Sequence, residues 1–467
     1  MVVLLCITVA TAIATAIYSS RAYSDLTTIG NESIPSVDGA QAVVPAIEDA
    51  QAQAAIYLAN ASPNAVQPCL LNSSGQRLTV LTFHDCADRN IDADLLLANH
   101  ELFLAGHNVS YPGGQTAIEQ TQKGLEAYSA SINLMRHDFN LATNKSNPGD
   151  PFMQQAYQAY SAATNLVRRS VGGPASAFSE ADIPACTIAG VTLPAQAWPA
   201  GGIDQNMNCL SAINKVHLDI AYQDTVKFVG VGLGVTFGLT MYSCIFLFWA
   251  TWSMASTVHR AFNPLLALAL LFALIVTGVV LADFDTIYGH NGSFSIIETD
   301  YNSVYSTTNL KQAATIAESD EAHWLLALAF HDPSAVSLHQ AWQSHMQAAQ
   351  TSLQAILSGS QSPQNVQLLN SIKQDWQRYD LQSSQVASTA PQDLHSAETI
   401  CSGSASQALQ QFTAGLNQFS ATRHQDYASA FNDANGRLSS LTILCAITFP
   451  LLGLIGVAGI LTRMREF

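Results

Sequence analysis

Residues 251–268, TWSMASTVHRAFNPLLAL, place one histidine–arginine pair between two long apolar runs. Those runs, residues 228–252 and 264–282, contain no charged residue. Each is close to the ~20 apolar residues that a helix needs to cross ~30 Å of hydrocarbon. The stretch therefore predicts two antiparallel membrane-spanning helices that are joined by a short polar loop, residues 253–263.

The composition of the whole chain agrees with a membrane protein. Of its 467 residues, 48% are hydrophobic and only 11% are charged, whereas an ordinary soluble domain has about 25% charged residues. Two further segments, 2–18 and 441–461, also contain no charged residue. The first could instead be a signal peptide, but it lacks a basic start and we interpret it as an anchor. The expected fold class is an all-α membrane protein with four transmembrane helices.

Four spans leave two long polar segments, 19–227 and 283–440, on one side of the membrane. The opposite side receives only the loop at 253–263 and the tail at 462–467. Arg260, Arg463 and Arg465 lie next to spans on this short side, and basic flanking residues mark the cytoplasmic face. We therefore expect a multi-pass plasma-membrane protein whose two large segments are extracytoplasmic.

The cysteines and the net charge fit that orientation. Four cysteines fall in the first large segment, which suits two disulfides in an oxidising compartment: Cys69, Cys86, Cys186 and Cys209. Three pairings are possible, and we favour Cys69–Cys86 with Cys186–Cys209 because each would close a short insertion. The formal net charge of −16 argues against nucleic acid as a partner, and against an anionic lipid surface as a partner of the outer segments.

Both large segments show the apolar spacing of helices. In the first segment, helices are expected at 40–60, 115–143, 151–170 and 206–227, with non-helical inserts at 61–90 and 171–205. In the second, helices are expected at 302–330, 334–357 and from Pro363, followed by a Ser/Thr/Pro-rich break at 383–403 and a helix at about 404–440 that continues into the last span. No convincing strand pattern is found. The pattern predicts one extracytoplasmic four-helix bundle in each segment, the first with disulfide-bearing inserts.

No motif for catalysis, a cofactor or a metal is found. FHDCAD at 83–88 brings a histidine and a cysteine together, but it lacks a second pair of ligands. His339 and His345 are six residues apart, which is not the spacing that puts two ligands on one helical face, and both are expected at the surface. Asp320 and Glu321 are expected to solvate a helix. We predict no enzymatic activity.

Arginines are the candidate ligand-binding residues. Arg136, Arg168 and Arg169 lie on predicted helices of the first bundle, and a guanidinium group suits a bidentate carboxylate. The alternative is that they solvate a helix face, and a cation near a helix C-terminus also offsets the helix dipole.

Four blocks of sequence resemble a known family: VVPAIEDAQAQAAIYLAN (43–60), HRAFNPLLALALLFALIVTG (259–278), AESDEAHWLLAL (317–328) and GILTRMREF (459–467). They resemble actinobacterial four-span membrane proteins with tandem chemoreceptor-like four-helix-bundle sensor domains. The resemblance implies a role in amino-acid sensing, beside an extracytoplasmic amino-acid-binding lipoprotein and a cytosolic Ser/Thr kinase pathway. The inserts at 61–90 and 171–205 depart from the plainer bundles of that family.

The expected function is a sensory or relay role in the membrane. The inner segments are too short for a signalling domain, so the output must pass through a partner protein. The polar groups that such a partner could contact are His259, Arg260, Arg463, Arg465 and Glu466. The alternative is a structural or assembly subunit of a larger membrane complex.

Overall fold

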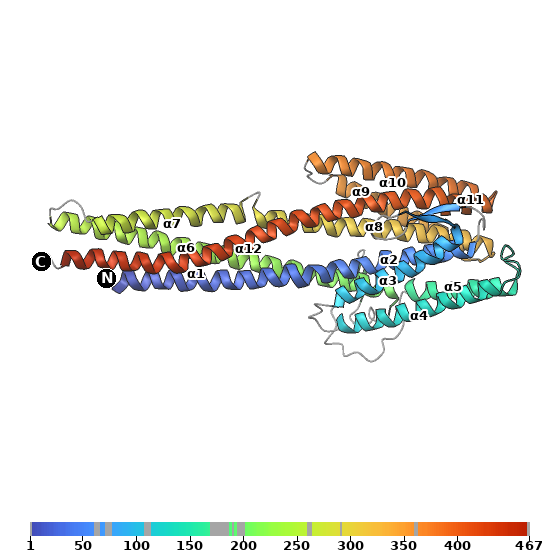
Figure 1. Ribbon diagram of the computed structural model, residues 1–467, viewed down its shortest axis with the longest axis horizontal. Coiled ribbons are helices and arrows are strands. Elements are labelled where there is room, and N and C mark those ends of the chain that lie inside the picture. Colours follow the sequence, from blue (N-terminus) through green and yellow to red (C-terminus); the bar gives the residue numbers. More distant parts are fainter. Residues whose placement is uncertain are drawn as a thin grey trace. The chain divides into compact units, whose positions relative to one another are not determined.

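The computed structural model describes residues 2–59, 66–70, 77–106, 114–168, 186–188, 191–193, 201–258, 264–289, 292–358 and 363–464 (Figure 1). They form two compact units. The apolar unit comprises Met1–Glu32, His217–Asn302 and His424–Phe467, and the polar unit comprises Ser33–Val216 and Ser303–Arg423. Each unit therefore contains segments from both halves of the chain.

Helices account for most of the described residues. In chain order they are α1 (Val2–Thr28), α2 (Ile34–Ala59), α3 (Phe83–Ala105), α4 (Gly114–Leu141), α5 (Pro151–Arg168), α6 (Ile203–Val258), α7 (Pro264–Tyr288), α8 (Ser293–Ala329), α9 (Ala335–Ser358), α10 (Pro363–Thr389), α11 (Leu394–Ile400) and α12 (Ser406–Met464). Two short π-helical turns, Ile29–Ser33 and Cys401–Ala405, precede α2 and α12. The predicted helical class is confirmed.

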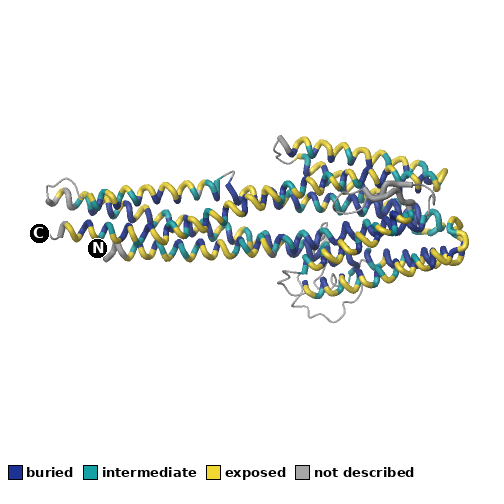
Figure 2. Tube along the Cα trace, viewed as in Figure 1, coloured by how far each residue is buried: buried dark blue, intermediate teal, exposed yellow. Residues whose placement is uncertain are grey.

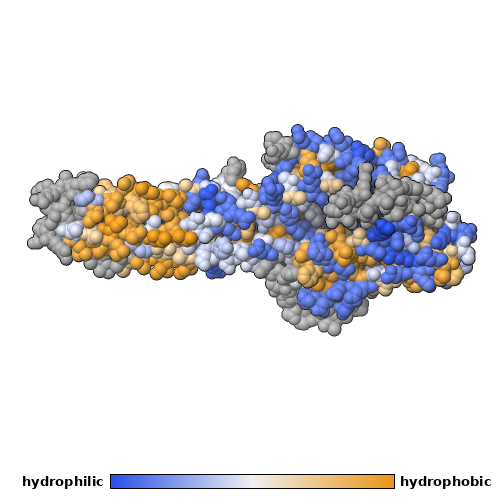
Figure 3. All heavy atoms as spheres, viewed as in Figure 1, coloured by the Kyte–Doolittle hydropathy of each residue, from blue (hydrophilic) through white to orange (hydrophobic). Residues whose placement is uncertain are grey.

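Three described helical stretches are long and apolar enough to cross a membrane: Ile203–Ser253, Pro264–Ala329 and Leu394–Thr462. They contain most or all of α6, α7 and α12. Figure 3 shows hydrophobic residues over much of the visible face of the apolar unit. On α7, Leu271 and Ile275 are more than half exposed, as expected for side chains that face lipid. The fourth predicted span, 2–18, is helical as part of α1 but is not among these three, so it stays a prediction.

In the polar unit, α2 and α8 are the most buried helices (Figure 2). The sequence of α2 is rich in alanine, which favours helix formation and lets neighbouring helices approach closely. At Gly39 a Cβ atom would lie 2.7 Å from the carbonyl oxygen of Glu101, so α3 lies directly against α2 at this point. One apolar core includes Val44 and Ile47 of α2 together with Leu325 of α8.

This shared core changes the expected picture of two separate bundles. Residues from both large segments pack in one compact unit, with a further apolar core among α8, α9, α10 and α12. The halves also meet through side chains, because Gln41 donates to Asn309 at 2.8 Å and Gln312 donates to Asn208 at 2.7 Å. A division into two four-helix bundles therefore remains a prediction.

Three local predictions were wrong. The insert at 61–90 was expected to be non-helical, but α3 begins at Phe83, with Ile91, Leu95, Ala98 and Leu102 buried at helical spacing. The break expected at 383–403 is also mostly helical, because α10 continues to Thr389 and α11 follows. In addition, four short strands form two antiparallel hairpins, Val66–Leu70 with Arg77–Thr82 (β1, β2) and Cys186–Ile188 with Val191–Leu193 (β3, β4).

Cys86 and Cys209 are both disulfide-bonded. The structure does not describe the side chains of Cys69 and Cys186. The predicted pairing of these four cysteines therefore stays a prediction.

Candidate functional site

A buried charged cluster joins the two halves of the chain inside the polar unit. Arg168 is the last residue of α5, and its guanidinium group contacts Glu48 of α2 and Asp320 of α8. Its Nε donates to Glu48 Oε1 at 2.9 Å, and its Nη2 donates to the Ser319 hydroxyl at 2.9 Å. We call Arg168, Glu48, Ser319, Asp320 and His345 the Arg168 cluster.

The two carboxylates of the cluster have no access to solvent. Glu48 and Asp320 are 0% exposed, while the Arg168 side chain is 22% exposed. His345 of α9 makes a second contact to Asp320, with 2.6 Å between Nδ1 and Oδ2. A buried carboxylate is costly unless it is paired and hydrogen-bonded, and here one guanidinium group pairs with a carboxylate from each half.

Burial and neighbouring charges shift the pKa values of the ionisable groups in and beside the cluster. Burial raises the pKa of Asp320, but the hydrogen bond from His345 and the charge of Arg168 outweigh it, so the pKa lies below its ordinary value. Burial alone would lower the pKa of Arg168, but Glu48 and Asp320 raise it well above its ordinary value. The pKa of nearby Asp204 on α6 is shifted in the opposite direction to that of Asp320. Burial, the charge of Glu48 and a hydrogen bond to Glu48 raise its pKa well above the ordinary value.

Further buried carboxyl groups lie beside the cluster on α8. Glu321 is 0% exposed and accepts a hydrogen bond of 2.6 Å from the Ser383 hydroxyl of α10. The Cys401 thiol lies 3.9 Å from its other oxygen, within the second π-helical turn. Burial raises the pKa of Glu321 to about 7, and burial with the charge of Asp49 raises that of Glu318 well above its ordinary value. Both glutamates therefore gain and lose protons at a higher pH than an exposed glutamate does.

The expectation that Asp320 and Glu321 solvate a helix was wrong. The two residues do point to different sides of α8, but both sides are covered: Asp320 faces Arg168 and His345, and Glu321 faces α10. His345, which was expected at the surface, has a 39% exposed side chain but pairs with Asp320. His339 contacts the Trp324 ring, with 4.4 Å between centroids. Sequence reasoning missed these residues because α8 is surrounded by partners from distant parts of the chain.

The structure separates the three candidate ligand-binding arginines. Arg168 lies in the buried cluster, and Arg169 lies outside the described residues. Arg136 of α4 pairs with Asp88 at 2.7 Å and Asp92 at 2.9 Å on α3, so its guanidinium group holds two helices together. Because the carboxylates of this chain already occupy Arg136 and Arg168, neither guanidinium group is left open to a ligand in this conformation. Their role in ligand binding stays a prediction.

Of the candidate cytoplasmic residues, His259, Arg260, Arg465 and Glu466 lie outside the described residues. Arg463 lies in α12, but its side chain is not described.

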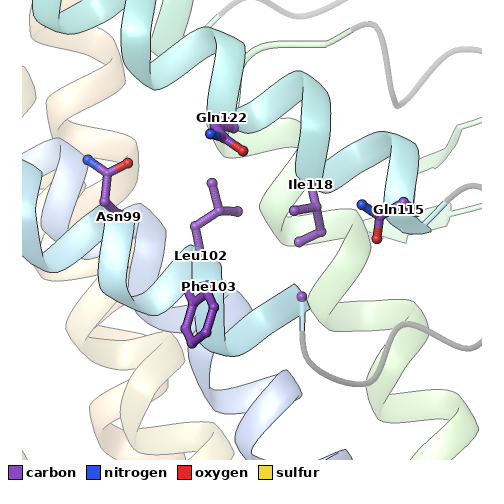
Figure 4. A pocket seen from close by; sticks show the side chains of 7 residues that line it. Asn99, Leu102, Phe103, Gln115, Ile118 and Gln122 are labelled. Carbon is purple, nitrogen blue, oxygen red and sulfur yellow. The ribbon is translucent and has the colours of Figure 1, made fainter.

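A cavity of about 440 Å³ lies between α3 and α4 (Figure 4). Leu102 and Phe103 of α3 and Ile118 of α4 line it, together with amide side chains at its edges. These amides are engaged along their own helices, as Asn99 donates to the Leu95 carbonyl and Gln122 donates to Glu126. The cavity therefore offers apolar surface but little directed polar chemistry.

Among the described residues, no group of three or more His, Cys, Asp or Glu side chains is placed to hold a metal ion. The arrangement as a whole is a set of buried ionisable groups whose pKa values depend on one another. No known protein family, curated protein or solved structure matches the chain.

Proposed function

We propose that this chain is a non-enzymatic sensory or relay protein of the membrane. Its polar unit detects a small solute or a solute-binding protein, and the spans pass the resulting state to a partner protein. The observation that carries this proposal is the Arg168 cluster, in which one guanidinium group joins Glu48 of α2 to Asp320 of α8.

The cluster suits a switch better than a purely structural role. Replacing a buried ion network by apolar residues of similar volume is often neutral or stabilising, so its presence is a poor way to gain stability. Its carboxylates come from both halves of the chain and outnumber its permanent cations, because the single guanidinium group of Arg168 pairs with both Glu48 and Asp320. A change in protonation or in the position of α5 would therefore alter how α2 and α8 are held together.

Unbroken helices offer a route from the polar unit into the spans. α6 and α12 each begin in the polar unit and continue as one helix through a candidate span. α1 is joined to α2 through a π-helical turn. Its Thr15 and Ser19 hydroxyls contact Thr236 of α6 and Thr442 of α12. These contacts support α1 as the fourth span.

We further propose that the polar unit is extracytoplasmic, that the protein lies in the plasma membrane, and that the partner contacts the loop at 253–263 and the tail at 462–467. The support is the basic residues Arg260, Arg463 and Arg465 on this short side of the sequence and the disulfide bonds of Cys86 and Cys209 in the polar unit. Reversing the charge at Arg463 and Arg465 should then uncouple the partner without unfolding the polar unit.

A distance measurement tests the relay directly. The full-length chain, in a Cys6→Ser background because Cys6 is exposed, receives spin labels at Ser256 of α6 and Thr462 of α12, both exposed. The test variant neutralises the cluster without leaving a lone charge: Arg168→Gln, Glu48→Gln and Asp320→Asn. In lipid nanodiscs we expect the mean distance to change by roughly 1–2 Å, the scale of interhelical shifts in switching proteins, or a second distance to appear.

The matched control neutralises the exposed ion pair of Lys227 with Asp224 on α6, and it should leave the distance unchanged. If the cluster variant folds and its distance distribution equals that of the wild type, the relay is wrong.

One observation favours the alternative of a structural or assembly subunit. Leu96 and Leu97 are neighbours on α3 and are 74% and 44% exposed, and exposed apolar surface is found at docking sites. A structural subunit should co-purify in fixed stoichiometry with a large complex, and the Leu96→Ser variant should release it. A relay should keep its solute response in that variant.

A further inference from the structure

The polar unit contains a second cavity, of about 380 Å³, that no role described above uses. It is lined by the C-terminal ends of α2 and α8, the connection between α4 and α5, and α11. Its walls are of mixed polarity, and their apolar part includes Leu58 of α2, Met153 of α5, and Leu326 and Phe330 at the end of α8. A volume of this size falls within the range of small-molecule sites, about 300–1,000 Å³.

One ionisable side chain in this cavity has no described partner that would offset the cost of its burial. Glu398 of α11 lines the cavity and is only 8% exposed. Within the described part of the chain, its carboxyl group has no hydrogen-bond or ion-pair partner. Burial alone raises its pKa to about 7, with no contribution from a nearby cation. A buried carboxyl group without a partner is rare in folded proteins, so this one is available to a ligand.

The other charged groups of the cavity do not fill that role. Lys145 lies on the α4–α5 connection with its Nζ 4.6 Å from the centroid of the Phe139 ring, where it makes a cation–π contact. His395 is exposed. Neither group is among the influences on the pKa of Glu398. The wall itself is ordered by stacking, because the Phe330 and Tyr157 rings lie 4.4 Å apart and 6° from parallel, and the Tyr157 hydroxyl donates to Asp332.

We propose that this cavity binds a small organic cation, an ammonium group attached to a compact apolar body. The ammonium group pairs with the Glu398 carboxylate, and the apolar body contacts Leu58, Leu326 and Phe330. A desolvated carboxylate favours a cation that replaces the lost water, and the aromatic face of Phe330 adds attraction for it. An anionic ligand would instead meet the carboxylate of Glu398.

This inference deepens the proposed function, on which its biological meaning rests, because the cavity is connected to the Arg168 cluster. Met153, Tyr157, Tyr160, Thr164 and Arg168 follow one another on the buried face of α5. Tyr160 contacts His323 of α8 edge-on, with 5.2 Å between ring centroids. The cavity walls come from both halves of the chain, so a bound ligand would stabilise one arrangement of α5 and α8 and thereby bias the cluster.

Binding is measured by calorimetry on the full-length chain in nanodiscs, with empty nanodiscs as the control for partition into lipid. The probes are benzylammonium, its neutral analogue benzyl alcohol and its anionic analogue benzoate. We expect saturable binding of benzylammonium at one site per chain, and at least tenfold weaker binding of the other two. Glu398→Gln should weaken benzylammonium binding at least tenfold, whereas Glu126→Gln, on the exposed side of α4, should not change it.

A second variant guards against a folding defect. Ala329→Phe fills the cavity without touching the carboxyl group and should also abolish binding. Binding should strengthen between pH 6 and pH 8 as Glu398 ionises, and a His395→Gln variant should keep this rise, which would separate Glu398 from the histidine. Equal binding by Glu398→Gln and the wild type, equal binding of benzyl alcohol, or heat that matches empty nanodiscs would overturn the site.

The experiments can overturn the relay and the ligand site independently of each other. If benzylammonium binds as described but leaves the distance between labels at Ser256 and Thr462 unchanged, the relay fails and the site stands. If no binding is found while neutralising the Arg168 cluster still changes that distance, the site fails and the relay stands.

Discussion

In the polar unit, Glu48, Asp320 and Glu321 are fully buried, and their carboxyl groups contact an arginine, a histidine, a serine and a cysteine from other helices. In the apolar unit, α6 and α12 contact α1 through hydroxyl groups, as between Thr15 and Thr236 at 2.9 Å, and the ion pair of Arg437 on α12 with Asp283 on α7 is partly exposed. The Thr15 and Thr236 hydroxyls each also lie within hydrogen-bond distance of a carbonyl of their own helix four residues earlier.

This contrast indicates where the molecule can respond to its surroundings. A hydroxyl that is already bonded within its own helix loses little when the neighbouring helix moves. A buried carboxylate depends on a cation from another element, because an unpaired charge in a protein interior is strongly unfavourable. The fully buried carboxylates of the polar unit therefore make it the part of the molecule where we expect the largest response to protonation, and under the proposed relay the candidate spans would pass on the state that is set there.

The largest effect is expected from removing the shared cation. Arg168→Met leaves Glu48 and Asp320 buried without their guanidinium partner and should lower the free energy of unfolding by about 3–5 kcal/mol. The control Lys227→Met breaks an exposed pair with Asp224 on α6 and should cost about 0–1 kcal/mol. Thermal and denaturant unfolding of the full-length chain in detergent measures both. Similar losses in the two variants would show that the cluster is not held by charge.

The free energy of unfolding should also fall as the pH rises from acidic to neutral values. Burial raises the pKa of Glu321 and of Glu398 to about 7, above the ordinary value in an unfolded chain, so between about pH 4.5 and pH 7 the folded state holds more protons. The stability contributed by these groups therefore falls as pH rises through this window, by about 1–3 kcal/mol per carboxyl group. The midpoint of thermal unfolding should be higher at pH 5.5 than at pH 8.

Below about pH 4 the trend should reverse, because the lowered pKa of Asp320 means that its paired, charged form is then lost. Glu321→Gln should stabilise the chain at pH 8 and flatten the profile. A profile that rises steadily from pH 5.5 to pH 8 would contradict the assignment.

In the apolar unit, close packing should matter more than polar contacts. A Cβ atom at Gly232 of α6 would lie 2.7 Å from the Cβ of Tyr18 on α1. Gly232→Ala should therefore cost about 1–3 kcal/mol. Gly234→Ala is the matched control, since its Cβ would meet nothing within 4 Å, and the better helix propensity of alanine should make it neutral or slightly stabilising. Equal effects at the two glycines would mean that α1 does not pack against α6.

The smallest effect is expected for the hydroxyl pair. Thr15→Val keeps the shape of the side chain but removes its bond to Thr236, and it should cost about 0.6 kcal/mol, the average for such contacts in membranes. Thr251→Val removes a hydroxyl whose hydrogen bond is to its own helix and should cost less. A loss at Thr15 as large as that for Arg168→Met would remove the contrast between the two units.

The sequence predicts the helical parts of the molecule well where periodicity is local. The helix expected at 115–143 is α4, Gly114–Leu141, and the helix expected from about 404 into the last span is α12, Ser406–Met464. It fails for α3, whose charged start FHDCADRN hides the apolar spacing that follows. It also fails at 383–389, where a serine-rich composition suggested a break but Ser383 is buried and satisfied by Glu321.

The site could be predicted only in fragments. Arg168 was singled out, but no local rule shows that residues 48, 168 and 320 meet. Their contacts depend on long-range packing of three helices. A useful signal was present nonetheless, because Asp320 and Glu321 precede a wholly apolar stretch, WLLALAF, on a helix that must be buried on more than one side.

Hydrogen–deuterium exchange of the full-length chain in nanodiscs tests the central claim, that the Arg168 cluster couples the two halves. The comparison is Glu48→Gln with the wild type, and Glu126→Gln on the exposed side of α4 is the control. If Arg168 transmits the change from α2, amides around Asp320 in α8 should lose protection together with those around residue 48. Loss confined to α2, with α8 exchanging as in the wild type, would contradict the account.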